Sequence, residues 1–197
     1  MSQLEVNKGD NVIIILDVSA SMQTTDTPSG ASRIDFVKEN AKTIAVEAGK
    51  WDTDGVDGFT FGHKVTSIGK LTADNVNAVI DPLKANEGST DTAAAIAEAW
   101  KQHRAGGYKQ TVAMLFTDGE PNDEDKVFST IAGITQELKD EHEFALSILT
   151  VGQRSAGLEA FLTKLDDALP GAKHDIVDVK RVEEVDFYAA FAGALHD

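Results

Sequence analysis

The 197-residue chain contains no cysteine, and it has only four prolines, two tryptophans and two tyrosines. Without cysteine it forms neither disulfides nor thiolate metal sites, and this absence favours a reducing compartment. Its strongly apolar runs, such as Val12–Leu16, are far shorter than the roughly 20 residues that span a bilayer. Residues 1–5 show no basic region followed by an apolar one, so we expect neither a secretion signal nor a membrane span.

Basic residues are also scarce, since 18 Lys and Arg stand against 33 Asp and Glu, for a net charge of −15. Such a chain repels phosphate backbones and anionic lipid, and no basic patch is visible, so we expect no nucleic-acid or membrane partner. Hydrophobic residues make up 42% of the chain. A domain of this length buries roughly 70% of its unfolded surface, so we expect a single domain over residues 1–197.

Apolar segments of strand length alternate with amphipathic segments of helix length, which indicates βα units around a parallel sheet. Strands are expected at 11–17, 56–61, 111–117, 144–151 and 175–179, with a short antiparallel one at 65–68. Helices are expected at 33–49, 73–83, 91–104, 123–140, 156–168 and 183–195. The predicted fold class is α/β: one doubly wound, Rossmann-like, mostly parallel sheet with one short antiparallel edge strand and helices on both faces.

Helical spacing of apolar residues predicts which face of each helix is buried. In the first helix this stripe is Ile34, Val37, Ala41, Ile44, Ala45 and Ala48. In the helix at 123–140 it is Val127, Ile131, Ile134 and Leu138. In the last helix it is Val185, Tyr188, Phe191 and Leu195. The longer irregular segment at 22–32 follows the first strand, where a recognition loop would be useful.

Polar side chains follow two of the predicted buried strands and open one helix. Asp17, Ser19 and Ser21 occupy alternate positions after Val12–Leu16, Thr90 lies just before a helix, and Asp118 follows the strand at 111–117. In an open α/β sheet, ligands bind at the carboxyl edge where the first and fourth strands are neighbours. Asp17 and Asp118 would face each other there and repel, raising at least one pKa. Oxygen donors of this kind suit a hard divalent cation placed between them.

Each of these segments also has a simpler interpretation. Ser19 and Ser21 could satisfy main-chain amides of a turn, Thr90 could be a helix N-cap, and Asp118-Gly119 could form an ordinary turn. The acids that follow suit the start of a helix. They are Glu120, Asp123, Glu124 and Asp125. Alternatively, Glu120 tunes or occupies an open position of the metal.

Taken together and in this order, Asp17-x-Ser19-x-Ser21, Thr90 and Thr117-Asp118-Gly119 resemble the von Willebrand factor type A domain. The resemblance covers essentially the whole chain and matches all five positions of the metal-ion-dependent adhesion site of that family. It implies that Ser19, Ser21 and Thr90 bind the metal directly, whereas Asp17 and Asp118 act mainly through coordinated water. Mg²⁺ is the expected ion, Mn²⁺ should substitute for it, and Ca²⁺ is less suited.

The resemblance implies a metal-dependent protein–protein interaction module rather than an enzyme. Neutral hydroxyl ligands leave much of the charge of the ion unquenched, so an Asp or Glu side chain of a protein partner is expected to complete its coordination. The resemblance further implies an intracellular adaptor, because stand-alone relatives without secretion signals or disulfides often have that role. By that analogy we expect a cytoplasmic protein, with an AAA-type ATPase system as one class of partner. The oligomeric state is not predicted.

Two other functions stay open. A Mg²⁺-dependent phosphoryl-transfer enzyme places a second Asp where Ser19 stands, and the chain has no Walker loop, Gly-x-Gly-x-x-Gly or nucleophile elbow. Its histidines have no zinc-like spacing. They are His63, His103, His142, His174 and His196. In the other function the protein is a scaffold whose metal only holds the loops, which predicts a lower melting temperature on chelation and no metal-sensitive partner.

Overall fold

Six strands form one sheet in the order β3-β2-β1-β4-β5-β6 in the computed structural model of the chain. The structure describes residues 6, 9–50, 54–107, 110–167 and 169–192. The strands are β1 (Asn11–Asp17), β2 (Val56–Phe61), β3 (Val65–Leu71), β4 (Thr111–Thr117), β5 (Phe144–Thr150) and β6 (Val177–Arg181). β3 pairs antiparallel with β2, and the other neighbours are parallel, which confirms the predicted fold class.

β1 and β4 lie side by side at the centre of the sheet and are buried along their whole length. This is why their sequences read as continuous apolar runs rather than as alternating ones. The chain turns to β2 on one side of β1 and to β5 on the other side of β4, so the order of winding reverses between them. Their carboxyl ends therefore border the crevice in which such sheets bind ligands.

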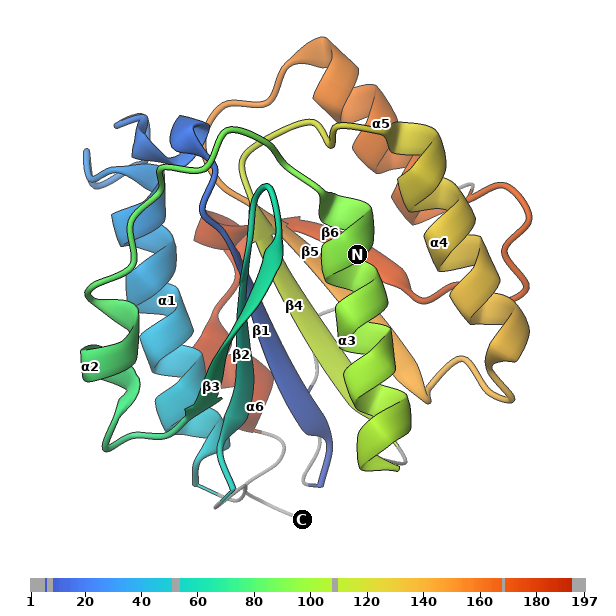
Figure 1. Cartoon of the computed structure of the whole chain (residues 1–197), viewed down its shortest axis with the longest axis horizontal. Coiled ribbons are helices and arrows are strands. Elements are labelled where there is room, and N and C mark those ends of the chain that lie inside the picture. The colour runs from blue at the N-terminus through green and yellow to red at the C-terminus, as the bar shows by residue number, and fades with distance from the viewer. Residues whose placement is uncertain (1–5, 7–8, 51–53, 108–109, 168, 193–197) are drawn as a thin grey trace.

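Helices cover both faces of the sheet (Figure 1). α1 (Arg33–Ala48), α2 (Val76–Ile80) and α6 (Phe187–Ala192) pack with Ile14 and Leu16 on one face. α3 (Thr92–Gly106), α4 (Glu124–Glu137) and α5 (Ala156–Asp167) pack with Ile13 and Ile15 on the other. Two short 3₁₀ turns complete the described elements. They are η1 (Ala20–Gln23) and η2 (Val182–Glu184).

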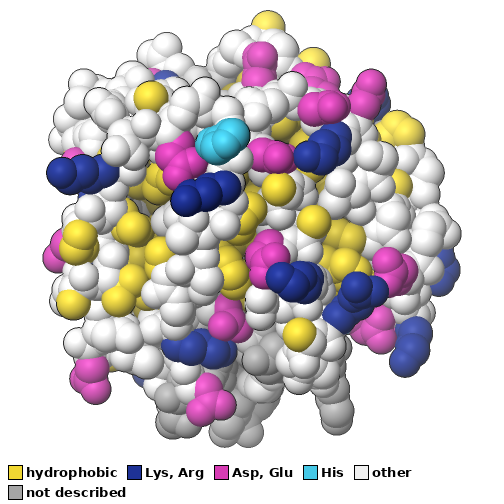
Figure 2. Space-filling view, in the orientation of Figure 1, with side chains coloured by type: hydrophobic (Ala, Val, Ile, Leu, Met, Phe, Trp, Pro, Cys, Tyr) yellow, Lys and Arg dark blue, Asp and Glu magenta, His cyan; other side chains and the backbone are white. Residues whose placement is uncertain are grey.

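The predicted apolar stripes of α1 and α4 are confirmed, because every residue of both is buried. Leu138 is buried although α4 ends at Glu137, since the chain leaves the helix in an extended conformation and still covers the core. Among the described residues no helix has the length and apolar character needed to cross a membrane. Figure 2 shows Lys and Arg side chains interspersed with Asp and Glu over one face of the molecule.

Several predicted boundaries are wrong. β3 continues to Leu71 instead of ending at residue 68, because Gly69 adopts a positive φ within the strand, next to a shift in register at Gly58. A glycine inside a strand often marks such an irregularity, so it need not mark the end of the strand. β6 begins two residues later than predicted, at Val177. α2 has five residues, where the spacing predicts a helix over 73–83.

The last helix is also out of phase with its prediction. Instead of continuous helix from residue 183, η2 is followed by extended backbone at Val185, and α6 begins at Phe187. The Asp186 side chain accepts a hydrogen bond from the Ala189 N–H at 3.1 Å, which stabilises this later start. The break resets the helical phase, so Phe187 is buried and Tyr188 is 64% exposed. The prediction that Tyr188 is buried is therefore wrong, whereas Val185 is partly buried against the core. The Phe191 side chain and Leu195 lie outside the part of the chain that the structure describes.

Candidate functional site

Asp17 is the last residue of β1, and its side chain is completely buried below the carboxyl edge of the sheet. Its Oδ1 accepts a hydrogen bond from the main-chain N–H of Ser19 at 2.8 Å. Its Oδ2 accepts one from the hydroxyl of Thr117 at 2.7 Å. Because Thr117 ends β4, this carboxylate joins the ends of the two central strands.

The hydroxyls of Ser19 and Ser21 extend this network toward the residue after β4. Their Oγ atoms are 3.0 Å apart, and the Ser21 hydroxyl donates to Oδ1 of Asp118 at 2.9 Å. Asp118 is only 4% exposed. Four of the five residues predicted to form the metal site are therefore joined by hydrogen bonds at one edge of the sheet. Metal binding itself stays a prediction.

Thr90, the fifth residue, reaches the same edge through main-chain contacts. The Ala20 N–H donates to the carbonyl oxygen of Glu87 at 2.8 Å, so the segment before Thr90 lies against the segment after β1. Thr90 and Asn122 are joined by two 3.1 Å hydrogen bonds, one of them to the Asn122 side chain. Gly62, which follows β2, lets the segment that carries Glu87 pack closely, because a side chain at position 62 would place its Cβ 2.6 Å from the Cβ of Glu87. The loops that carry these segments meet at one end of the sheet (Figure 1).

Burial raises the pKa of Asp17 to about 6, because surroundings of low polarity disfavour the charged form. Hydrogen bonds from Ser19 and Thr117 partly oppose this rise, and the negative charge of Asp118 adds to it. The sequence predicts that repulsion between the two carboxylates raises a pKa at this site. The structure shows that burial is the larger cause.

A countercharge that the sequence analysis missed lies beside Asp118. Arg33, the first residue of α1, donates from Nη1 to Oδ2 of Asp118 at 2.7 Å, and from Nε and Nη2 to Asp26 at 2.7 and 2.6 Å. We call these three residues the Asp26–Arg33–Asp118 clamp. The hydrogen bond from Arg33 is the main reason that the pKa of Asp26 falls to about 2. The helix dipole disfavours a cation in the first turn, so Arg33 is unusual at the start of α1, but this position does not point to Asp118.

The simpler interpretations of the individual motifs are weakened by these contacts. The side chain that caps α3 is Asp91, which accepts a hydrogen bond from the Ala94 N–H at 3.1 Å, so the N-cap interpretation of Thr90 is wrong. Ser19 precedes η1 without a side-chain capping bond, and its hydroxyl pairs with that of Ser21 instead. These two serine side chains are thus directed at each other rather than at turn amides.

The acids after β4 have different roles. Asp123 caps α4 by accepting a hydrogen bond from the Lys126 N–H at 2.9 Å, which confirms the helix-start interpretation for this residue. Glu120 accepts a hydrogen bond from the Ser155 hydroxyl at 2.6 Å. The Glu120 carboxylate therefore contacts the loop that precedes α5. Its proposed effect on an open metal position stays a hypothesis.

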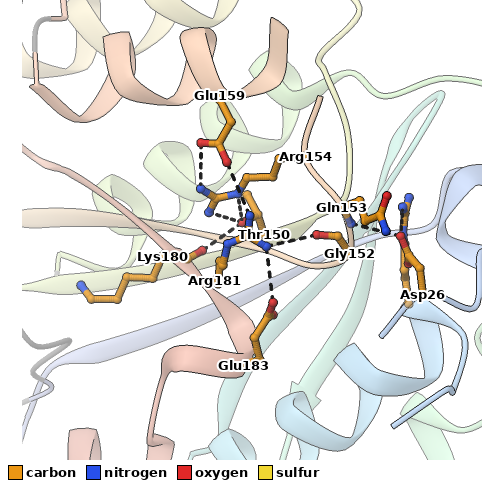
Figure 3. Close-up of polar contacts among 10 residues, drawn as sticks. Asp26, Thr150, Gly152, Gln153, Arg154, Glu159, Lys180, Arg181 and Glu183 are labelled. Carbon is orange, nitrogen blue, oxygen red and sulfur yellow. Dashed lines mark hydrogen bonds and ion pairs between the residues drawn. The ribbon is translucent and has the colours of Figure 1, made fainter. Parts of the chain in front are cut away.

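A hollow of about 420 Å³ lies beside the clamp, at the carboxyl ends of β5 and β6. Its lining consists of Asp26, Thr27, Pro28, Gly152, Gln153, Arg154, Arg181 and Glu183. Figure 3 shows Asp26 and Gln153 on one side, and Arg154 and Arg181 on the other, near Glu159 and Glu183. Both of these arginines form ion pairs with glutamates, so the hollow is not a basic patch.

The donor set at the edge consists of carboxylate and hydroxyl oxygens. In the described part of the chain, no cluster of three or more His, Cys, Asp and Glu side chains is placed to hold a metal ion. A cation at this edge would therefore depend on the hydroxyls of Ser19, Ser21 and Thr90 as well as on the two aspartates. Hard oxygen ligands of this kind fit Mg²⁺ or Mn²⁺, and they do not fit a thiophilic metal.

Several solved structures are similar to this chain in fold. The manganese-loaded TRAP protein of Plasmodium vivax is 17% identical, with a TM-score of 0.60 over 98% of this chain and 74% of that one. The PilB minor pilin of Streptococcus sanguinis is 12% identical, with a TM-score of 0.61 over 96% of this chain and 61% of that one. The RO protein of Deinococcus radiodurans is 14% identical, with a TM-score of 0.54 over 95% of this chain and 35% of that one.

The pilin and the RO protein are thus longer than the part of them that this chain matches. Among curated proteins, none is significantly similar in sequence. The model of the von Willebrand factor type A domain matches residues 11–186, which include all five predicted metal-site residues. The chain therefore belongs to the von Willebrand factor type A family.

Proposed function

We propose that this domain binds a protein partner through a divalent cation, Mg²⁺ in the first place, held at the carboxyl edge of the sheet. Ser19, Ser21 and Thr90 would hold the ion directly, and Asp17 and Asp118 would act through water. The observation that carries the proposal is the hydrogen-bonded series from Asp17 through both serines to Asp118. It brings oxygen donors from the ends of both central strands to one place.

The composition of this donor set decides the kind of chemistry that we propose. Hydroxyls carry no charge, so a bound cation keeps positive charge toward solvent and can accept a carboxylate from a partner. No catalytic role is proposed, because Ser19 stands where a phosphoryl-transfer enzyme needs its second acid. The fold relatives support a divalent ion and a binding role, since one is manganese-loaded and another is a pilin.

Calorimetry with Mg²⁺ and Mn²⁺ tests the metal site. We expect one ion per chain for the native protein, and at least about a 100-fold loss of affinity when Ser19→Ala and Ser21→Ala are combined. The matched control combines Ser67→Ala with Ser129→Ala, which removes two exposed hydroxyls elsewhere. The native protein binding no ion, or the Ser19 and Ser21 variant binding it as well as the control, would refute the site.

A pull-down in Mg²⁺, repeated with a chelator, tests the binding role. We expect the partner to be retained in Mg²⁺ and released by the chelator, and the same partner to be absent with the Ser19 and Ser21 double variant. A protein that binds Mg²⁺ by calorimetry and retains its partner in chelator would instead be a scaffold with a structural metal.

A further inference from the structure

The Asp26–Arg33–Asp118 clamp places a buried positive charge on a carboxylate of the proposed metal site. The Arg33 side chain is 11% exposed, and that of Asp118 is 1% exposed. Arg33 uses three separate nitrogen atoms for its three hydrogen bonds, at distances of 2.6 to 2.7 Å. Such short, charge-assisted bonds hold the guanidinium in one place.

The surroundings of Arg33 confirm that this placement is specific. Gly152 packs directly against the guanidinium, because a Cβ at that position would lie 2.3 Å from the Nε atom of Arg33. The N–H of Gln153 donates to Asp26 at 3.0 Å, so the loop after β5 holds the other side of the clamp. α1 and the loop after β5 therefore keep Arg33 against Asp118.

Arg33 and the proposed cation act on the same carboxylate. Oδ2 of Asp118 accepts from Arg33, while Oδ1 accepts from Ser21, which is one of the proposed metal ligands. An arginine stays protonated at every pH at which proteins fold, so its charge is permanent. A permanent positive charge beside a cation site weakens binding of the cation, and it strengthens binding of an anion to the loaded site.

We propose that Arg33 sets the charge of this site in favour of an anionic ligand: it lowers metal affinity and leaves the bound ion with more positive charge for an incoming carboxylate. The inference rests on the proposed metal site. It makes Arg33 a residue that selects the ligand, although Arg33 itself need not touch the metal. Asp26 acts in the opposite sense, because its carboxylate offsets part of the Arg33 charge.

Mn²⁺ calorimetry on charge variants tests the effect on the metal. We expect Arg33→Gln to bind Mn²⁺ on the order of tenfold more tightly than the native protein, and Asp26→Asn to bind it roughly twofold to threefold more weakly. Arg33→Lys keeps the charge and should stay within about twofold of the native affinity. Arg104→Gln is the matched control, because Arg104 is an exposed arginine paired with Glu137 near the opposite end of α3.

Acetate tests the effect on the anion. Mn²⁺ bound to the protein enhances the relaxation of water protons, and a carboxylate that displaces a water from the ion reduces that enhancement. We expect Arg33→Gln to need several times more acetate than the native protein for the same reduction. Asp26→Asn should need no more acetate than the native protein.

Tighter Mn²⁺ binding by Arg33→Gln together with weaker Mn²⁺ binding by Asp26→Asn supports the inference. A clamp with only a structural role would weaken Mn²⁺ binding in both variants. Weaker or unchanged Mn²⁺ binding by folded Arg33→Gln overturns it. If Arg33→Gln does not fold, Mn²⁺ binding by Asp26→Asn at or above the native affinity overturns it. Absence of Mn²⁺ binding by the native protein refutes the metal site instead, so the two failures are distinguishable.

Discussion

Gly152 shows how one residue without a side chain makes room for the clamp. Its φ of +80° lies in the left-handed region, and a Cβ would approach Arg33 to 2.3 Å. We expect Gly152→Ala to lower the free energy of unfolding by at least about 1–2 kcal/mol, from backbone strain and from displacement of Arg33. Urea unfolding measures this change.

Gly133→Ala is the matched control for this prediction. Gly133 is exposed within α4, its φ is not positive, and nothing lies within 4 Å of the place of its Cβ. Alanine there should raise the free energy of unfolding by roughly 0.5–1 kcal/mol, because a helical glycine loses more backbone entropy on folding. Equal effects of the two substitutions would contradict the role assigned to Gly152.

Single residues of the site were predictable to different degrees. Asp17 ends a buried strand and Ser19 and Ser21 come directly after it, so their place in the sequence predicts that they lie at the carboxyl edge of the sheet. Arg33 was missed because it is bonded to Asp118, 85 positions away, and no sequence pattern records that contact. Asn122 was missed for the same reason, since its amide holds the main chain of Thr90 across 32 positions.

At the scale of elements, the central strands were predicted most accurately. β1 and β4 have the predicted bounds, because residues buried on both faces form continuous apolar runs with polar ends, and β2 also has its predicted bounds although Asp57 and Thr60 interrupt its apolar residues. α2 and α6 were predicted poorly. Both are short, at five and six described residues; the side chain of Asp186 caps the start of α6, whereas Asn75 precedes α2 without a side-chain capping bond. Apolar spacing reports burial and does not report such local competition for hydrogen bonds.

The packing of α3 on β4 and β5 contains a buried histidine whose titration should affect stability. His103 stacks on Trp100 with ring centroids 5.0 Å apart, lies edge-on to Phe144, and hydrogen-bonds the Thr111 hydroxyl at 2.9 Å. Burial lowers the pKa of His103 below its ordinary value of 6.5, while the charge of Glu143 opposes that shift. The folded state therefore favours the neutral ring.

The sign of the pH effect follows from this direction. The unfolded chain binds the proton more readily, so the contribution of His103 to stability is present above pH 6.5 and is lost as the pH falls below it. We expect the melting temperature to fall between pH 7.5 and pH 5 by a smaller amount in His103→Gln than in the native protein. His142→Gln, at a histidine whose side chain is 74% exposed, should reproduce the native pH dependence. An unchanged slope in His103→Gln would contradict the prediction.

At the scale of the whole molecule, the topology accounts for the position of the site. The sheet order places β1 beside β4, so segments about 100 residues apart in sequence meet at one crevice. This much follows from the βα pattern, which is why the meeting of Asp17 and Asp118 was predictable. The identity of a partner does not follow from it, because the same fold carries different surface loops in different proteins.

The net charge of −15 gives any cation a general stabilising effect, which must be separated from binding at the site. Magnesium at about 100 times its dissociation constant should stabilise the native protein by ~2.7 kcal/mol, and so raise its melting temperature by roughly 5–10 °C. NaCl of equal ionic strength should give only the screening part of this increase. Combining Ser19→Ala with Ser21→Ala leaves the net charge unchanged. This variant should therefore keep the rise in melting temperature that comes from screening and lose the rise that comes from Mg²⁺ binding at the site. Equal increases in MgCl₂ for the native protein and this variant would show that the cation acts on the overall charge and not at the sheet edge.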